Sequence, residues 1–261
     1  MKPAVIAMAV SAAVTLLAAG SAFAAGSPFD GTWKVDLAKS QLAGDTVTYA
    51  KTATGYTSAG GAVTYPFAID GKAYPTMAGR TATWAAAKDG GFDIVFKDGA
   101  KVLTKAHRTL SADGKQMMTT YTEYRPDGTT ATEKDVYARV SGTTGLAGKW
   151  KSIKVDGVSD VETFSTPAPG TFKLEDATYK QVITGKLDGS PVTVTGPTIP
   201  AGATGTFLAK GPAVREYTYV VGGKVMGQGV MKLNADGKSM TDTSWAPGKE
   251  DEKSVSYYVK Q

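Results

Sequence analysis

The sequence predicts an all-β protein whose mature part consists of two antiparallel up-and-down β-barrel modules. Three observations support this prediction. Apolar residues do not recur at helical spacing over any window of about eleven residues. Short runs of Val, Thr, Tyr and Phe instead alternate with Asp-Gly and Gly-Gly turns. One order of motifs also occurs twice along the chain, which is typical of an internal duplication.

Residues 1–24 have the pattern of a secretory signal peptide. Lys2 gives a basic start, residues 4–19 are mostly apolar, and the small residues Ala22 and Ala24 precede the expected cleavage site. An uncleaved membrane anchor is the alternative, because the apolar run approaches the length of a membrane-spanning helix. The Ala-x-Ala ending favours cleavage after Ala24. We therefore expect a periplasmic or secreted bacterial protein that does not span a membrane once the signal is removed.

Composition excludes several classes of function. The 261 residues include no cysteine and one histidine, so disulfides, thiolate metal sites and a cysteine nucleophile are excluded. The formal net charge is +5, but the lysines are scattered through turns and strands rather than clustered, so nucleic acid is not an expected partner. With His107 as the single imidazole, we expect no metal and no cofactor.

The middle of the chain has the pattern of an antiparallel meander. Asp-Gly pairs at residues 98–99, 113–114 and 127–128 separate runs with high β-propensity, and such pairs favour hairpin turns. The strands are expected at 92–97, 102–110, 116–124 and 132–140.

Motifs from the first half of the chain occur again about 120 residues downstream, in the same order. Residues 31–34 correspond to 148–151, residues 110–115 to 233–238, and residues 137–139 to 258–260. Because these anchors keep one order, a chance match is a poor explanation. The sequence predicts a first barrel in residues 25–140 and a second barrel in residues 141–261.

The repeated motifs resemble those of the lipocalins and related calycin-type proteins. A Gly-x-Trp motif heads each module, a β-meander follows, and a basic residue lies in the last strand. Residues 29–40 resemble the opening of bacterial exported lipocalin-like proteins. The resemblance implies two lipocalin-like barrels in tandem, each closed at one end by a tryptophan that a basic side chain covers. By this resemblance Trp33 pairs with Arg139, and Trp150 pairs with Lys260, as structural barrel plugs.

A barrel of this size either fills with side chains or encloses one small ligand. Aromatic residues on the strand faces are candidates for a pocket wall, and packing in the core is the alternative. Gly227 and Gly229 would leave space in the second module. The candidate ligand-binding residues are Trp84, Phe92, Phe96, Tyr121, Tyr124, Tyr217, Tyr219 and Trp245.

The leading functional interpretation is an exported protein that binds a small apolar or amphipathic ligand. A protein–protein interaction module is the first alternative, either an envelope scaffold or a protease inhibitor acting through residues 25–28. An isomerase- or cyclase-like enzyme is the second alternative. It would use polar residues of the first module, namely His107, Arg108, Tyr121, Glu123 and Tyr124. No nucleophile elbow or phosphate loop is present, so we assign no catalytic residue and expect binding rather than catalysis.

Overall fold

The computed structural model describes residues 26–157 and 160–261, so the predicted signal peptide lies outside the described part. The described residues form twenty β-strands, all paired antiparallel in their sheets, and this confirms the all-β prediction. Within these residues we find no helix that is long and apolar enough to cross a membrane.

The strands in the first half of the chain are β1 (Gly31–Val35), β2 (Thr46–Thr52), β3 (Gly55–Gly60), β4 (Val63–Phe67), β5 (Ala73–Pro75), β6 (Arg80–Ala86), β7 (Phe92–Asp98), β8 (Lys101–Leu110), β9 (Gln116–Tyr124) and β10 (Thr130–Ser141). Those in the second half are β11 (Gly148–Asp156), β12 (Val161–Ser165), β13 (Thr171–Asp176), β14 (Gln181–Lys186), β15 (Asp188–Thr195), β16 (Thr204–Ala209), β17 (Val214–Val221), β18 (Lys224–Leu233), β19 (Ser239–Trp245) and β20 (Ser254–Lys260). The expected meander of the first module corresponds to β7–β10.

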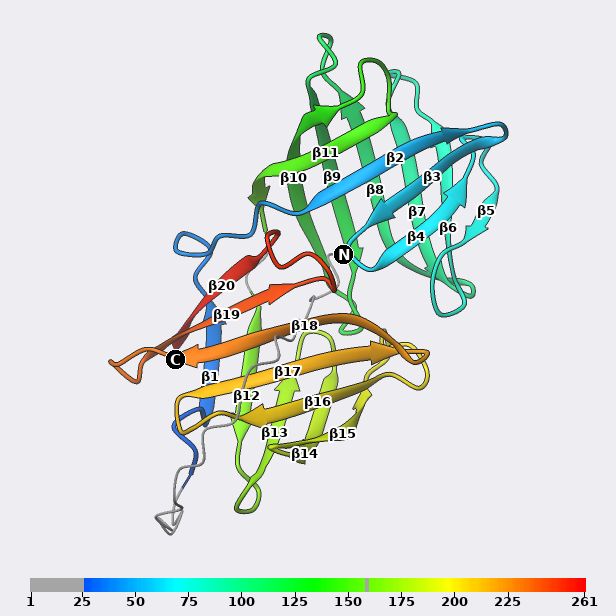
Figure 1. Cartoon of the computed structure of the whole chain (residues 1–261). Coiled ribbons are helices and arrows are strands. Elements are labelled where there is room, and N and C mark those ends of the chain that lie inside the picture. Colours follow the sequence, from blue (N-terminus) through cyan, green and yellow to red (C-terminus); the bar gives the residue numbers. More distant parts are fainter. Residues whose placement is uncertain (1–25, 158–159) are drawn as a thin grey trace.

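The strands form two ten-stranded sheets, which Figure 1 shows as separate curved bodies. Barrel 1 is the sheet in the order β4-β3-β2-β11-β10-β9-β8-β7-β6-β5, and barrel 2 is the closed sheet formed by β1 and β12–β20. Barrel 1 is nearly closed, because Ile69 makes a single bridge to Trp84 beside the two edge strands. Each edge strand contains a proline, Pro66 or Pro75, and proline cannot donate a ladder hydrogen bond.

The first strand of each sequence repeat lies in the sheet of the other repeat. β1 pairs with β12 and β20 in barrel 2, whereas β11 pairs with β10 and β2 in barrel 1. The chain therefore crosses between the barrels twice, from Val35 to Thr46 and from Asp156 to Val161. The division predicted at residues 140 and 141 marks the boundary of the sequence repeat, but the strand pairing does not follow it.

This exchange also reverses the expected pairing of tryptophans and basic residues. The Arg139 guanidinium lies 4.0 Å from the ring centroid of Trp150, and Lys260 Nζ lies 5.1 Å from that of Trp33. The pairings of Trp33 with Arg139 and of Trp150 with Lys260 are wrong, because each tryptophan travels with its exchanged strand. Both indoles are fully buried, and each donates a hydrogen bond to the carbonyl four residues earlier, that of Phe29 or Leu146.

The two barrels face each other with the ends opposite their buried tryptophans. We call these ends the mouths. At the mouths, Lys224 Nζ donates to the Ala62 carbonyl at 2.6 Å, and the Tyr179 hydroxyl donates to Glu123 Oε2 at 2.7 Å. Arg80 of barrel 1 likewise donates to the Thr198 carbonyl of barrel 2. The turns that join the strands at these ends consequently form the contact between the two bodies in Figure 1.

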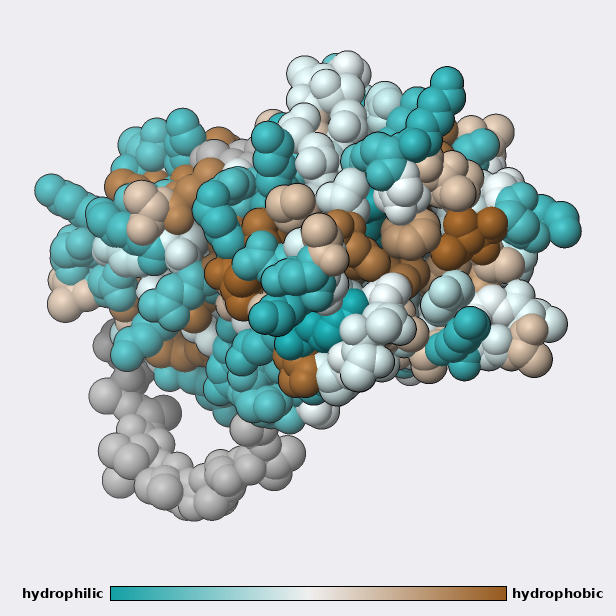
Figure 2. All heavy atoms as spheres, turned by 90° about the horizontal axis from the view of Figure 1, so that it is seen from above, coloured by the Kyte–Doolittle hydropathy of each residue, from teal (hydrophilic) through white to brown (hydrophobic). Residues whose placement is uncertain are grey.

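The outer faces of the barrels are mainly polar, as alternation along each strand requires. On the side seen in Figure 2, hydrophilic residues cover much of the molecule and apolar residues lie in patches among them. The large apolar side chains that remain exposed include Met118, Val140 and Ile153, on the neighbouring strands β9, β10 and β11. The main cores lie inside the two sheets.

Strand exchange can be tested by cross-linking, because the natural chain has no cysteine. Thr32 and Thr163 are register partners in β1 and β12, and their hydroxyl oxygens are 3.1 Å apart. We expect the double variant Thr32→Cys/Thr163→Cys to form an intrachain disulfide under mild oxidation, because antiparallel partners have suitable Cα separations. Loss of both free thiols, measured by mass spectrometry after alkylation, checks this.

The matched control tests the alternative arrangement, in which β1 would lie in barrel 1 in the place of β11. In that arrangement Thr32 would take the place of its repeat equivalent Lys149, whose register partner is Thr48. The variant Thr32→Cys/Thr48→Cys should retain two free thiols. If this variant cross-links and the Thr32/Thr163 variant does not, β1 belongs to barrel 1.

A candidate ligand-binding cleft between the barrel mouths

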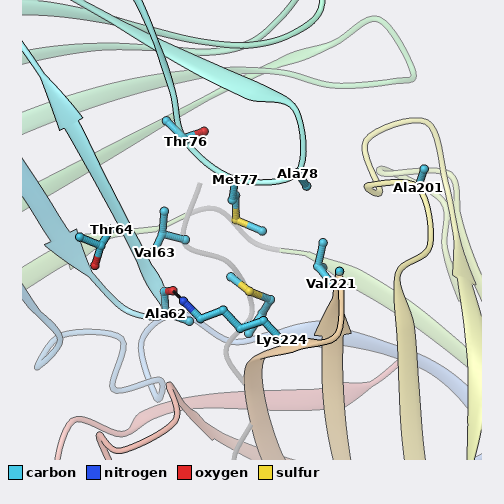
Figure 3. A pocket seen from close by; sticks show the side chains of 11 residues that line it. Ala62, Val63, Thr64, Thr76, Met77, Ala78, Ala201, Val221 and Lys224 are labelled. Carbon is cyan, nitrogen blue, oxygen red and sulfur yellow. Dashed lines mark hydrogen bonds between the residues drawn. The ribbon is translucent and has the colours of Figure 1, made fainter.

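An open cleft lies between the two mouths, and Figure 3 shows the side chains that line it. Its volume is ≈ 570 Å³. Side chains of both barrels point toward it, and most of them are apolar. Lys224 is the one charged residue among the described residues that line it. Barrel 1 contributes Ala62, Val63, Thr64, Thr76, Met77 and Ala78, and barrel 2 contributes Ala201, Val221, Gly222, Lys224 and Met226.

Tight glycine turns place these residues at the mouths. Gly222 and Gly223 join β17 to β18, and both have positive φ angles, 57° and 76°. Two consecutive residues of this kind are typical of the two-residue hairpin turn whose twist matches that of the flanking strands. The turn brings Val221 and Lys224 together at the tip, where their backbones are register partners. Gly61, with φ of 55°, makes the corresponding bend before Val63 in barrel 1.

Polar contacts between residues outside the cleft lining also join the two barrels. Glu252 of barrel 2 accepts hydrogen bonds from the Thr46 amide at 2.9 Å and from the Thr46 hydroxyl at 2.8 Å. Lys249 donates to the same carboxylate at 2.8 Å. These neighbours lower the pKa of Glu252 although its partial burial opposes them, so the carboxylate stays ionised at neutral pH. Val63 and Met77 of barrel 1 also pack against the core of barrel 2.

The interior of barrel 1 contains a buried cation. Arg108 is 4% exposed and donates to the hydroxyl groups of Thr119, at 2.9 Å, and of Tyr49 and Tyr121. Its guanidinium also lies 5.4 Å from the ring centroid of Trp84. Charged groups are buried at acceptable cost when they are hydrogen-bonded in this way. The predicted pocket residues Trp84 and Tyr121 therefore form the surroundings of an arginine.

The interior of barrel 2 contains buried carboxyl groups instead. The Tyr217 hydroxyl donates to both oxygens of Asp242, at 2.7 and 2.6 Å. Burial raises the pKa of Asp242 to about 7. Burial, with the nearby Asp160, Asp242 and Asp176, also raises the pKa of Glu162 well above its ordinary value. Among the described residues, Glu162 Oε2 is a buried atom without a hydrogen-bond partner.

Tyr217 also fills the space that Gly229 leaves. A Cβ atom added to Gly229 would lie 2.8 Å from the Tyr217 hydroxyl oxygen. The prediction that glycines at 227 and 229 leave space is therefore wrong for Gly229, because a neighbouring ring takes the volume of the missing side chain.

The remaining aromatic candidates lie in several different places. Phe92 and Phe96 pack against the core of barrel 1, and Tyr219 packs against that of barrel 2. Lys105 Nζ lies 5.6 Å from the ring centroid of Tyr124, and Lys253 Nζ lies 4.4 Å from that of Trp245. None of the eight predicted residues is among the described residues that line the cleft.

Of the polar cluster considered for an enzyme, the structure brings Arg108 and Tyr121 together inside barrel 1 but leaves His107 apart from them. His107 lies on the outer face of β8, where Nδ1 is 2.8 Å from Asp93 Oδ1 and Nε2 is 2.9 Å from Asp89 Oδ2. Hydrogen bonds to these carboxylates raise the pKa of His107. Arg108 follows His107 on β8 and points into the barrel, so the side chains of His107 and Arg108 lie on opposite faces of the sheet.

The segment considered as an inhibitory arm is held against barrel 2. The Ser27 amide donates to Asp30 Oδ2 at 2.9 Å, and Arg215 donates to the Ser27 hydroxyl at 2.9 Å. The Arg215 guanidinium lies 4.1 Å from the ring centroid of the buried Phe29. Ser27–Asp30 is thus part of the closed end of the barrel, and Ala25 lies outside the described residues.

No model of a protein family matches this chain, and a search of curated proteins also finds no match.

Proposed function

We propose that this is an exported binding protein that holds a small anionic amphiphile in the cleft between its barrel mouths. The observation that carries the proposal is the combination of an open apolar cleft with one cationic side chain, Lys224. The cleft volume lies within the range of roughly 300–1,000 Å³ that is typical of ligand pockets. Export rests on the signal-peptide pattern of residues 1–24.

The chemistry of the lining favours a ligand with an apolar body and an anionic group. Val63, Met77, Val221 and Met226 supply apolar contact, and the flexible methionines adapt to irregular shapes. Lys224 Nζ donates one hydrogen bond to Ala62, and an ammonium group has three donors in total. A carboxylate, sulfonate or phosphate at the rim could therefore accept another hydrogen bond from Lys224.

The proposal predicts binding of 1-anilinonaphthalene-8-sulfonate to the folded protein, measured by fluorescence titration. Ala201→Trp should weaken binding at least about tenfold, because the new indole would occupy the cleft. Ala112→Trp is the matched control, since Ala112 is an exposed residue in a turn at the closed end of barrel 1. This control should bind as the natural protein does.

Lys224→Met separates the charge from the apolar contact. We expect roughly fivefold weaker binding of the sulfonate probe, a loss typical of one partly exposed ion pair. Binding of the neutral dye Nile red should be unchanged. Equal sulfonate affinity in the natural protein, Ala201→Trp and Ala112→Trp would refute the cleft as the binding site.

A further inference from the structure

Three exposed apolar side chains lie together on the outer face of barrel 1. Met118 of β9, Val140 of β10 and Ile153 of β11 are 48%, 56% and 51% exposed, and they are three of the four large apolar residues exposed in the described part of the chain. These strands are neighbours in the sheet, as Figure 1 shows. From strand spacing and rise, the three side chains span roughly 10 Å by 14 Å. We call this surface the aliphatic patch.

Two β-bulges place Val140 and Ile153 in the aliphatic patch. The register of β10 against β11 skips Val140, so this residue has no partner in β11. The register also skips Ile153 of β11, opposite Val136 and Tyr137 of β10. A bulge redirects the side chain of its extra residue, and both extra residues here are aliphatic and more than half exposed. The local backbone is thus arranged in a way that exposes them.

The second repeat has the same fold without the patch. Met117 pairs with Tyr137 in barrel 1 as Met240 pairs with Tyr258 in barrel 2, which fixes the correspondence of the strands. Each patch residue then corresponds to a polar one, namely Met118 to Thr241, Val140 to Gln261 and Ile153 to Asp36. The fold therefore does not require apolar side chains at these positions.

Lysines surround the aliphatic patch. Those at outward positions, which alternate with buried ones, are Lys134 of β10 and Lys149, Lys151 and Lys154 of β11. Two carboxylates offset part of their charge, because Asp156 lies 2.9 Å from Lys154 and Glu252 lies 4.0 Å from Lys149. The other two lysines have no ion-pair partner among the described residues. This face of barrel 1 consequently has a net positive charge.

Aliphatic and cationic side chains on one convex face match the surface of an anionic bilayer. Lipid phosphates would neutralise the lysines, and the boundary of the acyl chains would accept the aliphatic side chains. A second copy of the chain matches poorly, because its lysines would meet the same lysines and a stable dimer needs about 800 Å² on each partner. A peptide strand cannot add here, since β9, β10 and β11 are each paired on both sides.

We infer that barrel 1 docks through the aliphatic patch on membranes that contain anionic lipid. The attachment is peripheral and reversible, because a few lysines and three aliphatic side chains bind far more weakly than a spanning segment. Salt weakens it by screening the lysines. This inference does not depend on the proposed ligand cleft, which lies between the mouths and uses other residues.

The test measures sedimentation of residues 25–261 with lipid vesicles. These residues contain all twenty strands, and residues 4–19 are omitted because their apolar side chains would bind lipid themselves. We expect binding to vesicles made of equal parts phosphatidylglycerol and phosphatidylcholine, and none to vesicles of phosphatidylcholine alone. Absence of binding to the anionic vesicles would overturn the inference.

Lys134→Gln/Lys151→Gln tests the charge of this face. Each lysine near an anionic membrane contributes about fivefold to affinity, so the double variant should bind roughly twenty-fivefold more weakly. Lys186→Gln/Lys232→Gln is the matched control, because it removes the same charge from exposed positions of β14 and β18 in barrel 2. The control should lose less than about twofold. Equal affinity of the two double variants would contradict docking through this face.

Met118→Thr/Val140→Gln tests the apolar contact with residues that the second repeat already has at these positions. Its urea unfolding should match that of the natural protein, and its affinity for the anionic vesicles should fall roughly tenfold. Sedimentation equilibrium without lipid tests the rival occupant. A dimer of the natural protein that this variant dissociates would make the patch an interface between copies and refute membrane docking.

A fluorescent label tests the orientation, because the natural chain has no cysteine. A nitrobenzoxadiazole label on Ile153→Cys should shift its emission to the blue when anionic vesicles are added, since the label leaves water. The same label on Lys186→Cys, in barrel 2, should not shift. A shift at position 186 without one at position 153 would show that another face meets the membrane, and the inference would fail.

Discussion

A fragment of residues 43–157 should fold, whereas the fragment 25–140, of almost the same length, should not. The first fragment contains β2–β11, all ten strands of barrel 1. The second follows the sequence repeat, but it lacks β11 and retains β1, whose partners β12 and β20 are absent. Well-dispersed amide signals in a proton–nitrogen correlation spectrum are expected for 43–157 alone.

The expected difference is large because β11 is an interior strand of the sheet, between β2 and β10. Trp150 is fully buried, and loss of such a side chain costs about 3–5 kcal/mol. Loss of β11 also removes the pairing to β10 and to β2, which exposes two strand edges. Natural domains have only about 5–15 kcal/mol of stability in total, so the shortened sheet should not persist.

Urea unfolding of both fragments provides the quantitative comparison. The fragment 43–157 should show one cooperative transition, and 25–140 should show none. A cooperative transition for 25–140 together with an unfolded 43–157 would mean that β1 completes barrel 1 in solution, contrary to the exchange.

The second large effect is an increase in stability as the pH is lowered from 7 to 5. The pKa of Asp242 is about 7 in the folded protein and near 3.8 when the side chain is exposed. Between these values the folded state holds a proton that the unfolded state has lost. The free energy of unfolding therefore falls by about 1.4 kcal/mol for each pH unit as the pH rises toward 7, and this contribution levels off above 7.

Asp242→Asn should remove this contribution. Urea unfolding at pH 5, 6 and 7 should show a slope smaller by about 1.4 kcal/mol per pH unit than that of the natural protein. The remaining slope would come from other buried carboxyl groups, such as Glu162, whose pKa is also raised. Asparagine can still accept a hydrogen bond from Tyr217, so the change is conservative.

Asp236→Asn is the control within the same barrel. Hydrogen bonds to the Lys238 amide and to Ser239 lower the pKa of Asp236, so this residue is ionised in both states above pH 5. Its variant should have an unfolding free energy that depends on pH in parallel with the natural protein. An unchanged slope in Asp242→Asn would show that Asp242 is ionised in the fold at these pH values.

The sequence predicts the elements well but not their assembly. Alternation and Asp-Gly turns identify the hairpins around residues 92–140, because strand period and turn geometry are local properties. The exchange is not local. Residues 31–34 and 148–151 carry nearly the same motif, so either strand fits either sheet, and the repeat pattern cannot distinguish the two arrangements.

The buried charges could have been found by comparing the repeats more closely. Arg108 and Thr119 are register partners in barrel 1, and Met231 and Asp242 are register partners at the equivalent place in barrel 2. A charged residue at an inward-facing position of an alternating strand predicts a buried charge. The first repeat has this charge at Arg108 on β8, and the second has it at Asp242 on β19. The cleft residues gave no comparable signal, because Val63 and Lys224 meet only through the contact of the two mouths.

The exchange of β1 and β11 has a consequence for the history of the chain. Two separate copies of one repeat could complete their sheets by donating first strands to each other, which would make a symmetric dimer. The present protein has the form of that dimer with both subunits joined in one polypeptide. Joining raises the effective concentration of the partners, so assembly no longer depends on how much protein is present. It also allows the two halves to differ, as their interiors do at Arg108 in one barrel and Asp242 in the other.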